Sequence, residues 1–335
     1  MTTEPFQRAD PTAAASATAG LPPPQASARR VLKYELLLLV ATMLWGPAFV
    51  AQQVGMAKGV GPLTFNALRF ALGGLSLLPI ILWRTLTLRP AGSSARLPWL
   101  GTLVAGLFLF AAAAFQQIGL QYTSSAHAGF ITAFYLVFVP LIGLLVGRRA
   151  GRSVWVGAAV CLAGFYLLSV TETFVPGRGD LLVLASAVLW ACQILAVDRV
   201  AGRGDALQIA VLQFVVCAAL SAVAGLLMES CSFRQIRAAS GALAYAGVLS
   251  VGGGFTLQVF CQGHCPPAPA AVIMSMEGVF AAAAGYWLLG QALTPRSLVG
   301  CGLILGGVLI VQLAPLAKPK AATAGGGGEQ TRQEP

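Results

Sequence analysis

LLLLVATMLWG at residues 36–46 and LLVLASAVLWA at residues 181–191 are two apolar stretches with Leu-Trp at the same place. The likeness continues in order, because Leu68-Arg69-Phe70 is matched by Leu212-Gln213-Phe214 and further short motifs follow in both copies. The offset between the copies stays between 141 and 145 residues. This order indicates a duplicated unit that fills nearly the whole chain.

The composition of the chain is that of a membrane protein. Of 335 residues, 57% are hydrophobic and 10% charged, with a mean hydropathy of +0.79, whereas about a quarter of the residues in a soluble domain are charged. A membrane-crossing helix needs roughly 20 mostly apolar residues. Ten such runs lie at about 36–57, 62–83, 97–119, 124–147, 154–171, 180–199, 207–228, 241–262, 268–289 and 297–314. We expect an all-α polytopic membrane protein with ten transmembrane helices.

Each copy contains five runs, and five is an odd number. If the first copy enters the membrane from inside, the second enters from outside, so the copies are inverted about an axis in the membrane plane. We expect two inverted five-helix repeats between two disordered cytoplasmic tails. The predicted boundaries are 1–34 for the N-terminal tail, 35–171 and 172–314 for the repeats, and 315–335 for the C-terminal tail.

The basic residues predict the orientation. With a cytoplasmic N-terminus, inner segments carry 15 of the 21 Lys and Arg residues, and Arg69 lies inside a span. The outer loops carry Lys58, Arg178, Arg234, Arg237 and Arg296. This excess follows the positive-inside rule with both termini cytoplasmic. The topology accounts for the net charge of +10, so we expect no nucleic-acid partner.

Two charged residues, Arg69 and Glu277, lie deep within predicted spans. A charge at the bilayer centre costs about 2.5–3.5 kcal/mol on the insertion scale, so neither side chain should face lipid. Glu277 is interpreted either as a protonatable or amine-binding carboxylate on a cavity wall, or as a group that locks two helices together. Arg69 is either structural or binds an anionic group of a substrate.

Glutamines form a second polar set, since Gln117 and Gln121 are one helical turn apart and Gln258 and Gln262 repeat that spacing in the other copy. They either line a shared polar cavity or form hydrogen bonds between helices. Further residues proposed for the cavity are Gln52 and Gln193, the mid-span pair Trp45 and Trp190, and Tyr135, which is equivalent to Glu277 in the repeat. For the tryptophans, central packing is the alternative.

Breaks in the helices are predicted where proline or glycine interrupts a span. Pro140 lies inside the fourth span, and Gly252–Gly254 lie near the middle of the eighth. Freed backbone groups in such segments can coordinate ligands or act as hinges, and simple kinks are the alternative.

The seven cysteines are scattered and mostly lie mid-span, which is typical of packing residues and not of a disulfide framework. Cys261, His264 and Cys265 form the one cluster, and a metal site there would need His127 as a fourth ligand. An ordinary loop end is the preferred interpretation. We expect no metal and no cofactor.

Several ordered motifs resemble the EamA-domain proteins of the drug/metabolite transporter superfamily. They are Leu44-Trp45-Gly46, Ala67-Leu68-Arg69-Phe70, AGFIT at 128–132, VFVP at 137–140, SMEGVFAA at 275–282 and LLG at 288–290. The resemblance covers about residues 36–314. One departure is Gly278 after Glu277, where the family often has proline, so a kink at this position has no proline to support it.

The resemblance implies two inverted five-helix repeats with the fifth and tenth helices peripheral and a central cavity. It also implies export or uptake of amino acids, other small metabolites or amphipathic drugs across a bacterial inner membrane.

We therefore expect a secondary carrier, not an enzyme, in which the repeats rock around a midplane cavity. No nucleotide-binding loop is found, so ATP is not expected as the direct energy source, and Glu277 is the candidate for proton coupling. The expected partners are a small-molecule substrate and the lipid bilayer, for a monomer or homodimer.

Three alternatives remain open: a passive channel, a non-transporting scaffold subunit and, more remotely, an intramembrane aspartyl protease. Gly177-Arg178-Gly179-Asp180 matches the Gly-x-Gly-Asp form of such proteases, but no second mid-span aspartate is found to share a proton.

Overall fold

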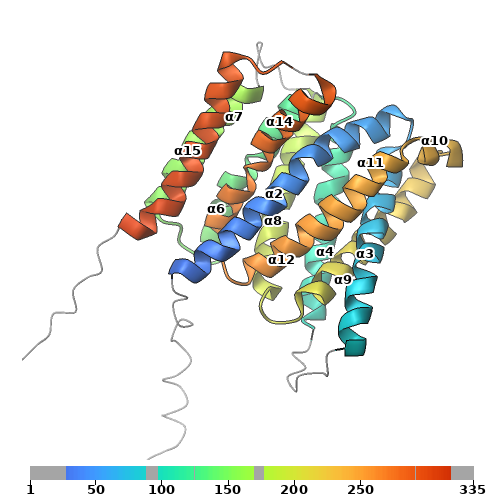
Figure 1. Cartoon of the computed structure of the whole chain (residues 1–335), viewed down its shortest axis with the longest axis horizontal. Coiled ribbons are helices and arrows are strands. Elements are labelled where there is room, and N and C mark those ends of the chain that lie inside the picture. Colours follow the sequence, from blue (N-terminus) through green and yellow to red (C-terminus); the bar gives the residue numbers. More distant parts are fainter. Residues whose placement is uncertain (1–27, 88–96, 124, 170–176, 291, 318–335) are drawn as a thin grey trace, which may run out of the picture.

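The chain folds into a bundle of helices (Figure 1). A computed structural model describes residues 28–87, 97–123, 125–169, 177–290 and 292–317, and these residues contain no strand. Ten helical spans in them are long and apolar enough to cross a membrane. The predicted all-α class and the predicted number of spans are confirmed.

The first copy holds spans one to five. They are α2 (Ala28–Ala57), α3 (Pro62–Thr87), α4 (Trp99–Gly119), α5 with α6 (Ser125–Thr132 and Tyr135–Leu145) and α7 (Arg152–Ser169). α2 begins at Ala28, so the end of the predicted N-terminal tail is part of the first helix. Residues 1–27 and 318–335, which make up most of both predicted tails, lie outside the described residues.

The second copy holds spans six to ten, and a short helix, α10 (Phe233–Ala238), precedes the eighth span. The spans are α8 (Arg178–Val200), α9 (Ala206–Met228), α11 with η1 and α12 (Ser240–Ala244, Tyr245–Phe255 and Thr256–Gln262), α13 with α14 (Pro267–Met274 and Glu277–Leu289) and α15 (Pro295–Ala317). Because each copy crosses five times, the second runs in the opposite direction to the first. The inverted arrangement is therefore part of the fold.

The two copies pack mainly on each other. α7 lies along α15 at one flank of the bundle and α3 lies along α9 at the other, and each pair consists of equivalent helices (Figure 1). The contact of α4 with α8 is likewise matched by the contact of α2 with η1 and α12. Because helices of one copy pack against helices of the other, the mid-span residues of both copies meet at the centre of the bundle.

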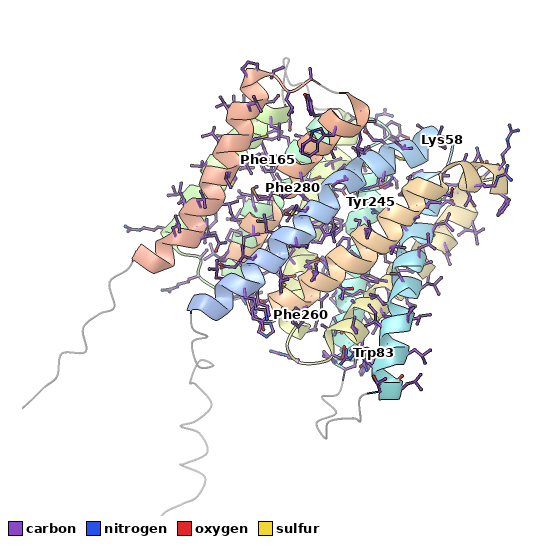
Figure 2. All side chains as sticks on the ribbon, viewed as in Figure 1. Lys58, Trp83, Phe165, Tyr245, Phe260 and Phe280 are labelled. Carbon is purple, nitrogen blue, oxygen red and sulfur yellow. The ribbon has the colours of Figure 1, made fainter. Side chains whose placement is uncertain are left out.

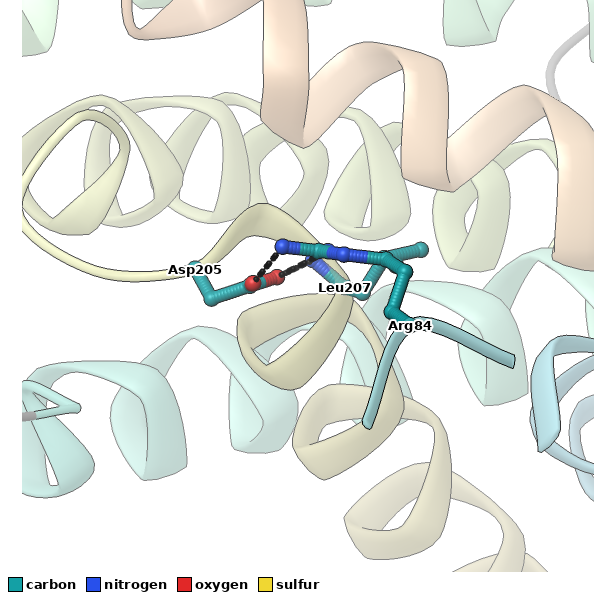
Figure 3. A network of polar contacts seen from close by, with 3 residues as sticks. All are labelled: Arg84, Asp205 and Leu207. Carbon is teal, nitrogen blue, oxygen red and sulfur yellow. Dashed lines mark hydrogen bonds and ion pairs between the residues drawn. The ribbon is translucent and has the colours of Figure 1, made fainter. Parts of the chain in front are cut away.

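Polar ties between the copies hold α3 at both of its ends. At its C-terminal end, Arg84 forms an ion pair with Asp205 at 2.7 Å, and Asp205 also caps α9 by accepting a hydrogen bond from the backbone N–H of Leu207 (Figure 3). At its N-terminal end, the Glu229 carboxylate accepts hydrogen bonds from the backbone N–H groups of Leu63 and Thr64, both at 2.8 Å. A carboxylate at a helix N-terminus is stabilised by the free N–H groups there.

The fourth and ninth spans are broken at equivalent positions. The breaks fall at residues 133–134 and 275–276, directly before Tyr135 and Glu277, which begin α6 and α14. In both breaks the backbone makes tight three-residue hydrogen bonds, such as Leu136 N to Ala133 O at 3.1 Å and Gly278 N to Ser275 O at 3.2 Å.

These breaks correct one prediction. Pro140 lies inside α6 and does not interrupt the fourth span. The ninth span is broken although Gly278 replaces the proline of the family pattern. Ser275 contributes there, because its hydroxyl donates to Val272 O at 2.7 Å and so offers the backbone a partner other than the helical one.

The eighth span departs from α-helical geometry at the glycines for which a break in the helix was predicted. Its centre is an eleven-residue π-helix, η1, which includes Gly252–Gly254. π-helical segments are rare and often occur at functional sites, because the wider turn displaces side chains and frees carbonyl groups.

Glycines allow α7 and α15 to touch backbone to backbone. A Cβ atom on Gly307 would lie 2.6 Å from Gly157 O, and one on Gly164 would lie 2.6 Å from Gly300 O. Gly157 and Gly164 are the repeat equivalents of Gly300 and Gly307. Each copy therefore supplies the same two small residues to one close crossing.

We expect Gly307→Ala to lower the thermal unfolding midpoint of the purified protein in detergent. The added methyl group overlaps Gly157 O, and overpacking of this kind costs about 1–3 kcal/mol. Gly306→Ala is the matched control, since nothing lies within 4 Å of a Cβ atom at Gly306. Equal midpoints for the two variants would contradict the proposed crossing.

Candidate functional site

A cavity of about 560 Å³ lies at the centre of the bundle, beside both helix breaks. Its walls come from both copies. The lining residues are Trp45, Ala48, Phe49, Gln52, Arg69, Gln116, Thr132, Tyr135, Trp190, Gln193, Ile194, Ser250, Phe255, Gln258, Met274 and Glu277.

Most of the residues proposed from the sequence meet at this cavity. Those in its wall are Trp45, Gln52, Arg69, Tyr135, Trp190, Gln193, Gln258 and Glu277. Gln117, Gln121 and Gln262 do not line it. The cavity wall therefore contains most of the residues predicted to line it, but it lacks three of the four glutamines that occur at the same spacing in both copies.

The three remaining glutamines have different surroundings. Gln121 lies beyond the end of α4 at Gly119 and is exposed, so its helical register with Gln117 is lost. Gln117 is fully buried, and neither atom of its amide has a hydrogen-bond partner among the described residues. Gln262 donates to Ile194 O at 3.2 Å and holds α12 against α8. The predicted symmetric amide faces are thus not present in the cavity wall.

A cluster of aromatic side chains from both copies packs at the central cavity. Phe255 packs against the equivalent tryptophans, with its ring centroid 5.0 Å from Trp45 and 5.8 Å from Trp190. Phe70 and Phe214, which are also equivalent, approach the same ring at 6.0 and 6.4 Å. The tryptophans thus both line the cavity and pack at its centre.

The π-helix positions one of these tryptophans. Trp45 Nε1 donates to Ser250 O, a carbonyl of η1, at 3.2 Å. Tyr245, at the start of η1, donates to Leu44 O at 3.0 Å, and its place between α2 and the eighth span is visible in Figure 2. Trp190 Nε1, by contrast, has no partner among the described residues. One indole is fixed by the protein and the other has a free donor.

Tyr135 and Glu277 meet across the pseudo-two-fold axis. The Tyr135 hydroxyl donates to Glu277 Oε1 at 3.4 Å, a long hydrogen bond. Both residues are the first of their half-helix, and the first N–H groups after Glu277 bond to the preceding turn, Gly278 N to Ser275 O at 3.2 Å and Val279 N to Met276 O at 3.0 Å. The contact gives the cavity a carboxyl group that is only partly satisfied by the protein.

In the second copy, buried amides form a continuous chain of hydrogen bonds. Gln193 donates to Gln213 Oε1 at 3.3 Å, Gln258 donates to Gln193 Oε1 at 3.1 Å, and Gln258 also donates to Gln262 Oε1 at 2.9 Å. This chain ties α8, α9 and α12 together. The polar groups of this half are therefore largely paired.

Arg69, the equivalent of Gln213, is in a different position. Its side chain is 4% exposed and lines the cavity, and its guanidinium lies 5.0 Å from the Phe70 ring centroid. Among the described residues it has no hydrogen bond and no ion pair. The expected structural partners, an acid or helix-end carbonyl groups, are not in contact with it there.

A second cavity, of about 910 Å³, adjoins the first. Phe49 and Glu277 line both. The second cavity extends along α14 from Glu277 to Leu289 and is also lined by Leu293, which follows α14, and by Ser169 and Ser297 at the ends of α7 and α15. Glu277 thus faces the central cavity on one side and a space that runs to the end of the bundle on the other.

Some lining residues were not singled out from the sequence. Thr132 ends α5 and accepts a hydrogen bond from Gln116 Nε2 at 3.0 Å. Thr132 is equivalent to Met274 in the repeat, and both line the cavity, so a comparison of the two copies could have identified this pair of positions. Ser250 and Phe255 carried none, because their positions depend on the π-helix.

Two other features of the sequence have structural roles. Asp180 caps the start of α8, accepting from Gly177 N at 2.8 Å and from Thr123 Oγ1 at 2.5 Å. His264 stacks on Tyr34 with ring centroids 3.8 Å apart, and its ring also lies 5.7 Å from that of Phe260. The described residues contain no group of three His, Cys, Asp or Glu side chains suited to a metal ion, and the His127 side chain lies outside them.

Known proteins share this architecture. A solved crystal structure superimposes with a TM-score of 0.73 at 23% identity, covering 85% of this chain and 99% of that chain, which shows a common fold. An uncharacterised protein of Pseudomonas aeruginosa is 31% identical over 84% of this chain and 94% of its own length. An uncharacterised transporter of Archaeoglobus fulgidus is 28% identical over 83% and 85%, respectively.

A relative with an assigned substrate is also found. The threonine/homoserine exporter RhtA of Escherichia coli is 27% identical over 82% of this chain and 90% of its own length. The EamA-like transporter family matches residues 32–170 and again residues 177–313. The chain therefore belongs to the EamA-like transporter family and is a multi-pass membrane transporter.

Proposed function

We propose that this protein is a secondary carrier that exports a small amino-acid-like metabolite by alternating access. The observation that carries the proposal is the central cavity, which lies between two inverted copies and is lined by charged, amide and aromatic side chains. Polar groups in the wall that the protein leaves unpaired, such as Arg69 Nε and Trp190 Nε1, favour a polar occupant, because the surrounding bilayer offers no partner.

The chemistry of the cavity wall supports an amphipathic substrate with both charges. Glu277 and Tyr135 suit an ammonium or hydroxyl group, Arg69 suits an anionic group, and the tryptophans and Phe255 suit an apolar portion. The likeness to RhtA, named for threonine and homoserine, supports the same class.

Alternating access is supported by the equivalent breaks before Tyr135 and Glu277 and by the π-helix opposite them. Discontinuous helices at the midplane occur in transporters built from inverted repeats, where one repeat moves against the other. One chain supplies the whole cavity wall, which supports transport by a monomer or by each chain of a homodimer.

Proton coupling through Glu277 is supported by its contact with both cavities. A proton entering through the second cavity reaches the carboxyl group without passing through the central one. Among the described residues, Glu277 is the only carboxylate in the central cavity wall, so substrate ammonium and proton would compete for it.

The basic loop residues support a bacterial plasma membrane protein with both termini in the cytoplasm. In that orientation the second cavity runs toward the outer surface.

We expect proteoliposomes loaded with unlabelled threonine to accumulate radiolabelled threonine by counterflow, because a carrier exchanges substrate across the membrane. Empty liposomes and liposomes without internal threonine are the controls. Leakage of label without a counterflow overshoot would indicate a channel, and no uptake of threonine, homoserine or other amino acids would contradict the proposal.

Glu277→Gln is expected to abolish the stimulation of net threonine flux by a pH gradient and to retain counterflow, because glutamine keeps the shape and loses the proton-binding group. Tyr135→Phe, which removes only the hydrogen bond to Glu277, should keep the gradient dependence. Equal gradient dependence in wild type and Glu277→Gln would exclude coupling through this residue.

The proposed orientation places Cys231, between α9 and α10, at the outer surface. We expect a membrane-impermeant maleimide to label the protein in intact cells and Cys231→Ser to remove that labelling. Labelling that requires broken cells would reverse the orientation.

A further inference from the structure

Arg69 is a buried cation without a partner of the opposite charge. Removing a guanidinium from water is unfavourable unless hydrogen-bond acceptors surround it. The protein offers the Phe70 ring at 5.0 Å, and among the described residues it offers no carboxylate or carbonyl acceptor. The two ion pairs among the described residues are formed by Arg84 and Arg148, and Arg69 takes part in neither of them.

The second copy shows what is missing beside Arg69. There Gln213, the equivalent of Arg69, is hydrogen-bonded to Gln193, three residues after Trp190. The residue three positions after the equivalent Trp45 is Ala48, and both Ala48 and Arg69 line the cavity. The first copy therefore has only a methyl group in the cavity wall at the position where the second copy has an amide side chain.

We propose that Arg69 and the space over Ala48 form the site for the carboxylate group of the transported substrate. The proposal rests on the proposed function, which it deepens by assigning one end of the substrate to one residue. The ligand supplies the acceptor oxygens that Gln193 supplies in the amide chain of the other copy.

The geometry favours a carboxylate over a simple halide. A guanidinium presents its N–H groups as a planar fork that matches the two oxygens of a carboxylate. Arg69 Nε is buried without a partner, and Trp190 Nε1 is a second unpartnered donor in the same cavity wall. Two donors of this kind suit a group with two acceptor oxygens.

The rest of the wall limits the charge of the ligand. Glu277 carries the only acidic group in the described wall of the central cavity, and Arg69 carries the only basic one. A ligand with two negative charges would leave one of them without a cation. A single carboxylate at Arg69 with an ammonium group toward Glu277 leaves neither protein charge uncompensated.

The site is tested by ligand binding to the purified protein in detergent, followed by tryptophan fluorescence because Trp190 lines the cavity. Sodium propionate is the probe, propionamide is its neutral isostere, and sodium chloride at equal ionic strength is the anion control. We expect propionate to bind at least about tenfold more tightly than propionamide, as a charged hydrogen bond is stronger than a neutral one.

Four variants separate binding from folding. Arg69→Gln, which installs the residue of the other copy, should weaken propionate binding at least about tenfold, and Arg69→Lys should restore part of it. Ala48→Gln should fill the space, satisfy Arg69 and remove propionate binding with the unfolding midpoint kept or raised. Arg84→Gln, on the same helix but outside the cavity, should leave binding unchanged.

Equal binding of propionate by wild type and Arg69→Gln would overturn the site, as would binding of chloride alone or of propionamide as tightly as propionate. A loss of the folded state in Arg69→Gln, Arg69→Lys and Ala48→Gln alike would show a purely structural arginine. If propionate binds through Arg69 but no amino acid shows counterflow, the site stands and the proposed carrier function fails. If threonine counterflow is unchanged in Arg69→Gln, the carrier function stands and the carboxylate site fails.

Discussion

Every polar group in the middle of this bundle needs a partner inside the protein, because the hydrocarbon around it offers none. The second copy meets this constraint with the amide chain through Gln193 and Gln258. The first copy meets it only in part, since Arg69 and Gln117 have no hydrogen-bond partners among the described residues. The difference between the copies leaves the buried guanidinium of Arg69 unpaired in the wall of the central cavity.

Residues that are equivalent in the two copies build the scaffold around the central cavity. Equivalent glycines bring α7 and α15 into backbone contact, and equivalent aromatic residues surround Phe255. Equivalent breaks then deliver Tyr135 and Glu277 to a common point. Residues that match between the copies thus shape the cavity, and residues that differ supply its chemistry.

Much of this could be predicted from the order of apolar runs. The number of spans and most of their ends follow from length and hydropathy, since a bilayer imposes both on any crossing helix. The breaks were harder to place. Pro140 was the obvious candidate, yet the helix tolerates it and breaks before Tyr135. Helix spacing also failed at Gln121, because α4 ends at Gly119 and the next turn follows another course.

The sequence by itself determined the duplication, the odd number of spans in each copy and the two mid-span charges, Arg69 and Glu277. These features follow from composition and residue order, because the bilayer restricts which residues can lie inside a span and which can lie in the loops. Only the tertiary structure decided which polar residues face the same cavity and which of them are paired. Hydrogen bonds between α8, α9 and α12 join residues far apart in the chain, so the free guanidinium of Arg69 becomes visible only once both copies are packed.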